Sequence, residues 1–235
     1  MLTLAIDTST SVGGVAIVDN DRLVAACALN VKRTHSERLM SMVERVVSDS
    51  DLKVRDIEAI ACGVGPGSFT GVRIGVSAAK CLSYTLNLPI VGVCGLDAMA
   101  FSVPFDGTVV SMIDAKHSRT FTASFTYQGP GKEPLRVCDY SLEPVSQTIE
   151  KTLRLKGPYL FLGDGSLAYS QILYDSFGGD LHLMPHAMSV VSPCSVGVLG
   201  NVMMAAGHFD DPALLLPFYM RESEPEMKLA GRENS

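Results

Sequence analysis

The chain has 235 residues, of which 47% are hydrophobic and 19% are charged, so it carries enough apolar material for a folded core and lacks the composition of a disordered protein. Its formal net charge is −6, and Lys and Arg are spread thinly along the sequence. This charge distribution argues against a protein that binds a nucleic-acid backbone by itself, because neutralising phosphates requires a basic patch.

No segment of the sequence is predicted to span a membrane. The longest apolar candidate, 196–209, includes Asn201 and His208 and falls short of the roughly 18 residues that a span needs. The N-terminus shows neither the basic region nor the cleavage site of a signal peptide. The six cysteines are scattered without a Cys-x-x-Cys pair. We therefore expect free thiols in a reducing cytoplasm, rather than disulfides or a zinc site.

The first part of the chain predicts three strands, followed by alternating helices and strands. Apolar runs at 2–6, 13–18 and 23–29, separated by short polar turns, are typical of a three-stranded meander. A helix is expected after Thr34, because Glu37 completes a capping box and apolar residues then recur at helical spacing. The segments that follow predict a strand, a helix and a strand, at 57–64, 69–86 and 89–94.

A weaker copy of this plan begins near residue 107. Asp7 and Asp114 each follow an apolar strand and precede a small polar turn and a second strand, which indicates an internal duplication. The copy predicts strands at 109–113, 120–127, 134–142 and 159–162, and helices at 145–153 and 166–177. We predict an α/β protein with lobes at 1–104 and 105–193, a helix near 194–208 that completes the first lobe, and an extended tail at 210–235.

A duplicated βββαβα plan with Asp and small residues in the first turn resembles the actin, Hsp70 and sugar-kinase superfamily. The resemblance implies a two-lobed actin-like fold, here with a degenerate second lobe, in which such turns hold nucleotide phosphates between the lobes. Backbone N–H groups in these turns can bind an anion. The residues of this candidate vestigial nucleotide site are Asp7, Thr8, Ser9, Gly65, Gly67, Ser68, Asp114, Gly163, Asp164 and Gly165. No cofactor is expected beyond weak or interface-dependent binding of ATP or ADP.

The same residues also have a structural interpretation. Asp7 can end a strand and accept backbone N–H groups of the turn that follows it. The glycines of 65–71 lack the Lys-Ser/Thr of a P-loop and suit a tight turn with close approach of a helix to a strand. Ser68 lacks the Gly-x-Ser-x-Gly context of a hydrolase nucleophile and is placed to cap the next helix.

A closer resemblance is to the TsaB (YeaZ) family. It is carried by LAIDTSTSVGGVAIV at 4–18, THSERLM at 34–40, GPGSFTGVRIG at 65–75, LPIVGVCGLDA at 88–98 and LPFYMR at 216–221. The first four strings cover the first lobe almost end to end, and GPGSFTGVRIG is the most specific of them. The second lobe matches only at 114–116 and 163–165, and Lys116 stands where the family usually has Arg.

This family resembles the catalytic protein TsaD, in which two histidines at i and i+4 bind a metal. The corresponding positions here are Gly95 and Met99, and neither residue can replace an imidazole. The resemblance therefore implies a non-catalytic subunit without a metal. Its implied role is to support TsaD, with the ATPase TsaE, in forming N6-threonylcarbamoyladenosine at position 37 of tRNAs that read ANN codons. The implied partners are TsaD, TsaE and, when TsaD is absent, a second copy, with tRNA met only through the complex and no membrane.

Two other functions, a small kinase and a metalloprotease, are alternatives to this one. A small ATP-dependent kinase of the same superfamily would need a complete nucleotide cleft and a general base, for which both lobes are too short. A metalloprotease would need metal ligands, and the five histidines show no ligand spacing. His182 and His186 are four residues apart, but Pro185 between them argues against one helix face.

The helix at 69–86 carries two small-apolar stripes, although one stripe is enough to cover a sheet. The second stripe therefore indicates burial against another helix or another chain. The helix at 39–47 contains methionines and is an adaptable neighbour for such a contact. The resemblance implies that these two helices bind TsaD or a second copy. The residues chosen for this interface are Leu39, Met42, Val43, Val46, Val72, Val76, Ala79, Leu82, Ser83 and Leu86.

Overall fold

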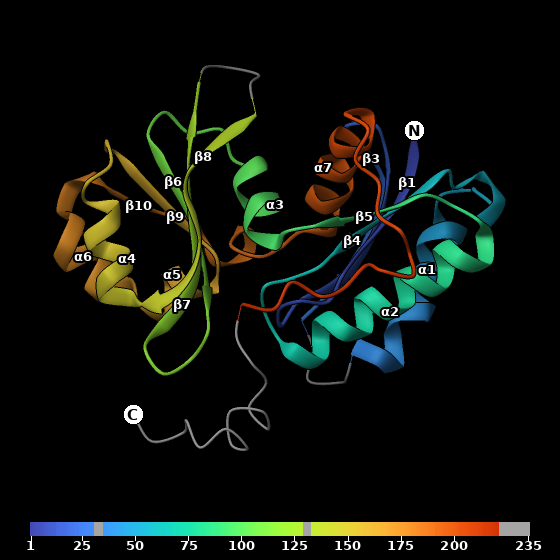
Figure 1. The fold of residues 1–235 in the computed structure, drawn as a ribbon, viewed down its shortest axis with the longest axis horizontal. Helices are drawn as coiled ribbons and strands as arrows, with labels where there is room; N and C mark the ends of the chain where they lie inside the picture. Colours follow the sequence, from blue (N-terminus) through green and yellow to red (C-terminus); the bar gives the residue numbers. More distant parts are fainter. Residues whose placement is uncertain (31–34, 129–132, 221–235) are drawn as a thin grey trace.

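The computed structural model describes residues 1–30, 35–128 and 133–220 and shows two five-stranded sheets side by side (Figure 1). The first sheet contains β1 (Leu2–Asp7), β2 (Gly13–Asp19), β3 (Arg22–Leu29), β4 (Ala59–Gly63) and β5 (Ile90–Val93). The second contains β6 (Thr108–Asp114), β7 (Arg119–Tyr127), β8 (Pro134–Pro144), β9 (Tyr159–Leu162) and β10 (Leu181–Leu183).

The two sheets have the same topology. The strand order is β3-β2-β1-β4-β5 in the first sheet and β8-β7-β6-β9-β10 in the second. In both, the first three strands are antiparallel and the last two run parallel to the central strand. This agreement confirms the duplicated, two-lobed α/β fold predicted from the sequence.

The second lobe is the reduced copy. The first lobe carries two long helices, α1 (His35–Asp49) and α2 (Phe69–Leu86), whereas the second carries α4 (Val145–Thr152), α5 (Asp164–Ala168) and α6 (Ser170–Phe177). The single helix predicted at 166–177 is wrong, because Tyr169 has a φ of −114° and a ψ of 21°, which interrupts the helix. Short 3-10 helices lie at Val54–Asp56, Gly178–Asp180 and His186–Met188.

Two further differences concern short elements and the start of α1. The helix α3 (Gly95–Phe101) and the strand β10 were not predicted, because seven and three residues are too few to show a hydrophobic period. The capping box predicted at Thr34 lies outside the described residues.

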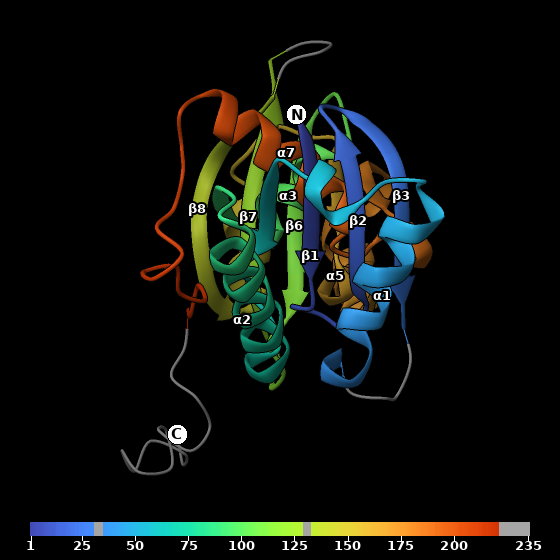
Figure 2. The same ribbon diagram turned by 90° about the vertical axis from the view of Figure 1, so that its right-hand side faces the viewer.

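The size of the side chains distinguishes the two faces of the first sheet. Successive strand residues point to opposite faces. Leu4, Ile6 and Ile17 pack with α1 and α2 on the face that Figure 2 presents, whereas Ala5, Ala16 and Ala61 share a cluster with α3 and α7 (Pro193–Ala205). A Cβ at Gly200 of α7 would lie 2.6 Å from the Cβ of Ala61. Small residues on both sides thus let α7 pack closely on the sheet.

One apolar cluster joins the two lobes. It includes Val93 of β5, Leu96 and Met99 of α3, and Phe121 and Phe125 of β7. Figure 1 shows α3 between the sheets, where it contributes to this shared core. The predicted boundary at residue 104 lies between the strands of the two sheets, but the shared core extends across it. The division of the chain into domains at this residue remains a prediction.

The segment His186–Ala205 is long and apolar enough to cross a membrane by length and composition, yet half of its most apolar stretch is buried inside the protein. Its helical core, α7, spans 13 residues, whereas a membrane span needs about 20. The helix packs against β1, β2 and β4. We therefore interpret it as a core helix of the first lobe.

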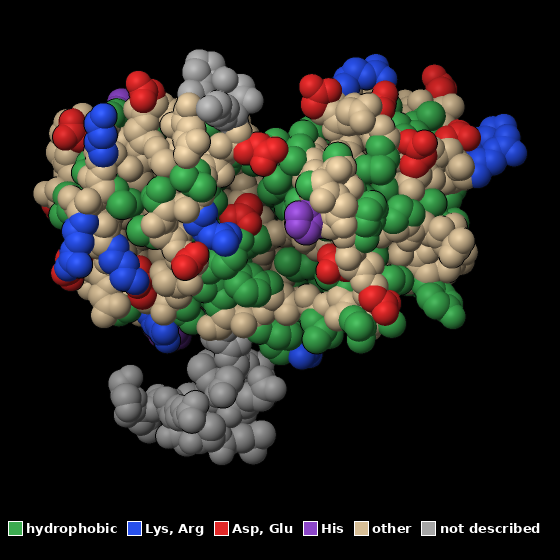
Figure 3. Space-filling model, turned by 45° about the horizontal axis from the view of Figure 1, so that its top comes forward, with side chains coloured by type: hydrophobic (Ala, Val, Ile, Leu, Met, Phe, Trp, Pro, Cys, Tyr) green, Lys and Arg blue, Asp and Glu red, His purple; other side chains and the backbone are tan. Residues whose placement is uncertain are grey.

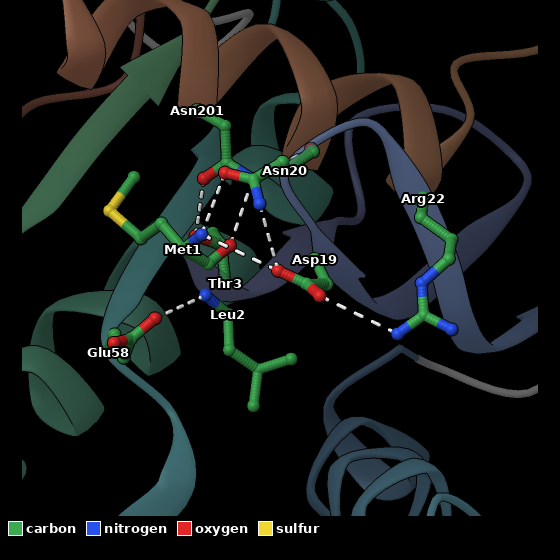
Figure 4. A network of polar contacts seen from close by, with 8 residues as sticks. All are labelled: Met1, Leu2, Thr3, Asp19, Asn20, Arg22, Glu58 and Asn201. Atoms are coloured by element: carbon green, nitrogen blue, oxygen red, sulfur yellow. Dashed lines mark hydrogen bonds and ion pairs between the residues drawn. The ribbon is translucent and has the colours of Figure 1, made fainter.

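Asn201 ties this helix to the N-terminal strand (Figure 4). Its side-chain amide donates to the carbonyl oxygens of Asn20 at 2.9 Å and Met1 at 3.3 Å. Its oxygen accepts a hydrogen bond of 2.5 Å from the hydroxyl of Thr3. Thr3 and Asn201 are 0% and 6% exposed, so these hydrogen bonds satisfy polar groups that water cannot reach.

Replacing Asn201 with Leu is expected to lower the free energy of unfolding by about 2 kcal/mol or more, because the buried Thr3 hydroxyl loses its partner. The double variant Thr3→Val/Asn201→Leu should recover part of this loss, since removing both partners leaves fewer unsatisfied groups. Urea unfolding of the three proteins measures both effects. A single variant as stable as the wild type would contradict the assigned network.

Candidate functional site

The first polar turn lies at the end of β1 and is closed by hydrogen bonds among its own residues. The Asp7 carboxylate accepts hydrogen bonds from the backbone N–H of Ser9 at 3.1 Å and from the Ser9 hydroxyl at 3.0 Å. Asp7, Thr8 and Ser9 are each at most 1% exposed. Burial raises the pKa of Asp7 to about 6, although the hydrogen bonds from Ser9 favour the ionised form.

The glycine-rich segment 65–71 packs directly on this turn. The backbone N–H of Ser68 donates to the Ser9 carbonyl at 2.7 Å, and the Thr8 hydroxyl donates to the Gly71 carbonyl at 2.7 Å. A Cβ at Gly67 would lie 2.0 Å from the Ser9 carbonyl oxygen, so only glycine permits this approach. The Ser68 hydroxyl caps α2 by accepting from the Gly71 N–H. These contacts agree with the structural interpretation of the segment.

The second polar turn, at the end of β6, is also closed by internal hydrogen bonds. The Asp114 N–H donates to the Asp164 carboxylate at 2.9 Å. The Asp114 carboxylate accepts from Lys116 Nζ at 2.7 Å and from the Tyr169 hydroxyl at 3.0 Å. Burial raises the pKa of Asp114, but the hydrogen bonds from Lys116 and Tyr169 and the charge of Lys116 together outweigh it, so the net pKa is lowered. Lys116 thus serves as an internal partner of Asp114.

The predicted nucleotide-site residues therefore form two clusters. Asp7, Thr8, Ser9, Gly65, Gly67 and Ser68 gather at the end of β1. Asp114, Gly163, Asp164 and Gly165 gather at the end of β6, where a Cβ on Gly163 or Gly165 would lie within 2.9 Å of the Met112 carbonyl oxygen. No hydrogen bond between described residues joins the two clusters. Nucleotide binding at either cluster remains a prediction.

Gly95 and Met99, which the resemblance sets against metal-binding histidines of TsaD, lie in the core shared by the lobes. Met99 is 3% exposed, and a Cβ on Gly95 would already lie 3.2 Å from the Cγ2 of Val191. The Gly95 N–H donates to the Gly65 carbonyl at 2.8 Å. A side chain at Gly95 would therefore press against Val191, which would have to shift by a few tenths of an ångström.

The structure corrects most of the interface residues chosen from the sequence. The chosen stripes of α1 and α2 are the ones that cover the first sheet, so their side chains fill the intramolecular core beside Leu4 and Ile6. Leu82 and Leu86 remain partly exposed. The residues at most 7% exposed, for which an outward-facing position is wrong, are Leu39, Met42, Val43, Val46, Val72, Val76, Ala79 and Ser83.

A groove of about 490 Å³ nevertheless lies between α1 and α2, lined mainly by apolar side chains. Met40 and Val54 are 52% and 45% exposed, and Leu82 and Leu86 line the opposite side. The sequence-based choice missed Met40, because it lies outside the core-facing stripe that the helical period reveals. The available signal was the presence of methionines in this helix, because methionine adapts to irregular contacts.

The described part of the C-terminal tail, 210–220, contains a turn at 212–214 and is anchored to the first lobe. Leu215 is buried, and the Phe218 N–H donates to the Val64 carbonyl at 2.8 Å. The Tyr219 hydroxyl accepts from Arg73 Nε at 2.7 Å, and its ring stacks on Phe69. The tail thus runs along α2 and over the glycine-rich segment.

The raised pKa of Asp7 predicts a specific pH dependence. Below its unfolded value of about 3.8 the carboxyl is neutral in both states, so it makes no difference to stability. As pH rises, the unfolded chain ionises first, so the wild type loses stability relative to Asp7→Asn. The loss is about 3 kcal/mol and is complete above about pH 6. Urea unfolding of both proteins from pH 4 to pH 7 tests this, and a constant difference would refute it.

Comparison with known proteins gives strong similarities over nearly the whole chain. A family model described as TsaD, tRNA N6-adenosine threonylcarbamoyltransferase, matches residues 29–227. The chain is 32% identical to the tRNA threonylcarbamoyladenosine biosynthesis protein TsaB of Bacillus subtilis (strain 168), with 97% of each chain covered. It is 31% identical to the protein of the same name from Escherichia coli (strain K12), covering 99% of this chain and 100% of that one.

The structural comparison agrees with this. A crystal structure from Pseudomonas aeruginosa, of an uncharacterized protein with similarity to peptidase YEAZ, matches with a TM-score of 0.75 and 23% identity. It covers 94% of this chain and 99% of the other. At that identity it shows the shared two-lobed fold. With the TsaB relatives matched across both lobes, the chain belongs to the TsaB (YeaZ) family.

Proposed function

We propose that this protein is a non-catalytic, cytoplasmic subunit in the formation of N6-threonylcarbamoyladenosine at position 37 of tRNAs that read ANN codons. In this role it binds TsaD and, with TsaE, supports the transfer that TsaD catalyses. The relatives in Bacillus subtilis and Escherichia coli carry the name of this biosynthetic process. A second copy occupies the same surface when TsaD is absent.

The apolar groove between α1 and α2 is the observation that carries this proposal. Contact of this surface with water is unfavourable in free energy, because its side chains are apolar. They are the exposed Met40 and Val54 and the partly exposed Leu82 and Leu86. Its two walls are helices, so an apolar helix of a partner could pack between them, as in helix-in-groove recognition. The flexible side chain of Met40 can adapt to different partners, which suits both TsaD and a second copy.

Two features support a subunit without its own chemistry. Gly95 and Met99, which the resemblance sets against the metal ligands of TsaD, pack in the core. The Asp7 carboxylate is hydrogen-bonded to Ser9 of the same turn. The net charge of −6 supports contact with tRNA only through the complex. On the face shown in Figure 3, Lys and Arg side chains lie among Asp and Glu side chains.

The groove can be tested with a charge at an exposed position. Met40→Glu should fold normally, because Met40 is 52% exposed, and should lose the complex with TsaD. Burying an unpaired charge costs several kcal/mol, against about −8 kcal/mol for a micromolar complex. Co-elution with TsaD from the same organism and circular dichroism on one sample measure both properties.

Two matched variants sharpen this test. Ile172→Glu places the same charge at a 49% exposed position on α6 and should leave the complex intact. Met42→Glu places it at a 7% exposed core position and should disrupt the fold itself. A folded Met40→Glu variant that binds TsaD as tightly as the wild type would move the interface away from this groove.

The non-catalytic assignment has its own test. The isolated chain should show no ATP hydrolysis, no proteolysis and no threonylcarbamoyl transfer, and metal analysis should find no stoichiometric ion. Asp7→Asn is the control, because it keeps the size of the buried side chain. Turnover by the wild type that Asp7→Asn abolishes would overturn the assignment.

A further inference from the structure

Three of the four outer strand edges of the described sheets are protected against pairing with another strand. The edge of β5 is covered by the tail, because Asp210 bridges to Ile90 and its carboxylate accepts from the Gly92 N–H at 2.7 Å. The strand β10 has only three residues, and β8 carries charged side chains and pairs with β7 in an irregular register. Covering segments, short strands, charges and bulges are the means by which proteins avoid unwanted strand pairing.

The fourth edge, that of β3, lacks this protection. Figure 2 shows β3 at the outer side of the first sheet, beside α1. Its residues 23–29 include neither a charged residue nor a proline. A bulge at Val24 interrupts the pairing with β2 near the start of the strand, but 25–29 pair in regular register. A groove of about 300 Å³ between 25–28 and α1 leaves this regular stretch accessible.

The hydrogen bonds of the inner strands determine which backbone groups of β3 face outward. The Glu58 N–H donates to the Leu2 carbonyl, so the backbone groups of Leu2 face β4. Alternate residues of a strand face opposite neighbours, so Ala5 faces β2, and its partner Ala16 faces β1. The adjacent residue of β2, Val15, therefore directs its N–H and C=O groups to β3.

The free backbone groups of the edge belong to Ala26 and Ala28. Val15 is the partner of Cys27, so the backbone groups of Cys27 are used inside the sheet. Those of Ala26 and Ala28 point away from it, and no residue in the described ranges bonds to them there. Both residues are exposed. The edge thus presents unpaired N–H and C=O groups, which is the pattern that an added strand recognises.

We propose that a second copy of this chain pairs with this edge, antiparallel and about a two-fold axis at Cys27. In that register Ala26 lies opposite Ala28 of the second copy, and the two residues exchange their N–H and C=O groups. The two Cys27 residues lie opposite each other in the non-hydrogen-bonded position, with Cα atoms about 4.5 Å apart. The pairing joins the five-stranded sheets of both copies into one continuous sheet.

The helix beside β3 favours a second copy over an unrelated strand. Because α1 packs on β2 and β3, the α1 helices of two copies would be two strand spacings, or roughly 10 Å, apart, which is a normal distance for packed helices. Arg45 and Asp49 line the groove beside β3 and form an exposed ion pair at 3.3 Å. A two-fold axis brings Arg45 of each copy toward Asp49 of the other, so this surface is complementary to itself.

This pairing is separate from the contact with TsaD in the proposed function. Met40 and Val43 line the apolar groove between α1 and α2, whereas Arg45 and Asp49 line the groove beside β3. A dimer formed through β3 therefore leaves the apolar groove free. Two complexes with TsaD could be joined in this way.

Self-association of the full chain tests the edge. Met40→Glu blocks the apolar groove, so a dimer that this variant forms at about 100 µM in sedimentation velocity reports on β3. Adding Ala26→Pro should raise the dissociation constant about tenfold or more, because proline removes the outward N–H but is tolerated at a strand edge. Ala26→Lys is a second blocking variant that keeps this N–H. With Met40 retained, both variants at Ala26 should still bind TsaD.

Mild oxidation tests the register. Cα atoms about 4.5 Å apart lie within the range that a disulfide spans, so copper phenanthroline should link Cys27 of two copies. Mass spectrometry should identify the peptide that contains this link. The dimer band on a non-reducing gel should be lost in Cys27→Ser and kept in Cys81→Ser, which removes an exposed cysteine of α2.

Several results would overturn the proposal. They are a Met40→Glu variant that stays monomeric at about 100 µM, oxidised dimers that persist in Cys27→Ser, and unchanged dimer affinity in both variants at Ala26. Circular dichroism checks that these variants are folded. Loss of the complex with TsaD in folded Ala26→Pro and Ala26→Lys would assign the edge to TsaD and not to a second copy.

Discussion

The packing of α3 between the two sheets is the contact on which the arrangement of the lobes depends. Leu96 and Met99 fill the apolar cluster that both lobes share. Polar contacts then surround the helix, because Asp97 accepts from the Tyr140 hydroxyl and pairs with Arg136. Burial raises the pKa of Asp97 although both partners oppose the shift. The lobes are thus joined by a continuous core and a half-buried ion pair, and the tail adds Phe218 against the Tyr140 ring.

This shared core also bears on the chemistry of the fold. Gly95 lies against Val191 at the start of α3, and the two polar turns are closed by their own hydrogen bonds. The residues predicted to surround a phosphate or a metal are engaged in hydrogen bonds and packing that hold strands, turns and helices together. In the proposed role, the surfaces that matter lie on the outside of the protein, where side chains are not committed to the fold.

The two copies of the duplicated plan have different outer surfaces. In the first lobe, the helices α1 and α2 leave an apolar groove with Met40 and Leu82 on its walls. In the second lobe, the short helix α4 faces β7 with threonines, and the groove there is lined with hydroxyls and an ion pair. The same topology therefore carries two grooves with different linings, because the helices that cover each sheet differ in length and side chains.

The sequence by itself determined the elements with a strong pattern. The helix Phe69–Leu86 was predicted to the residue, and Ser68 caps its start as expected. The structure adds that Asn87, in the left-handed conformation, ends it. The duplication was also predictable from the repeated strand, Asp and turn. The outward face of α2 was decided only by the tertiary structure. Val76 and Leu82 are both apolar and both lie at helical spacing, but only Val76 is directed at the sheet. Likewise Met42 is buried and Met40 is exposed, because the position of a helix relative to its sheet depends on residues far away in the sequence.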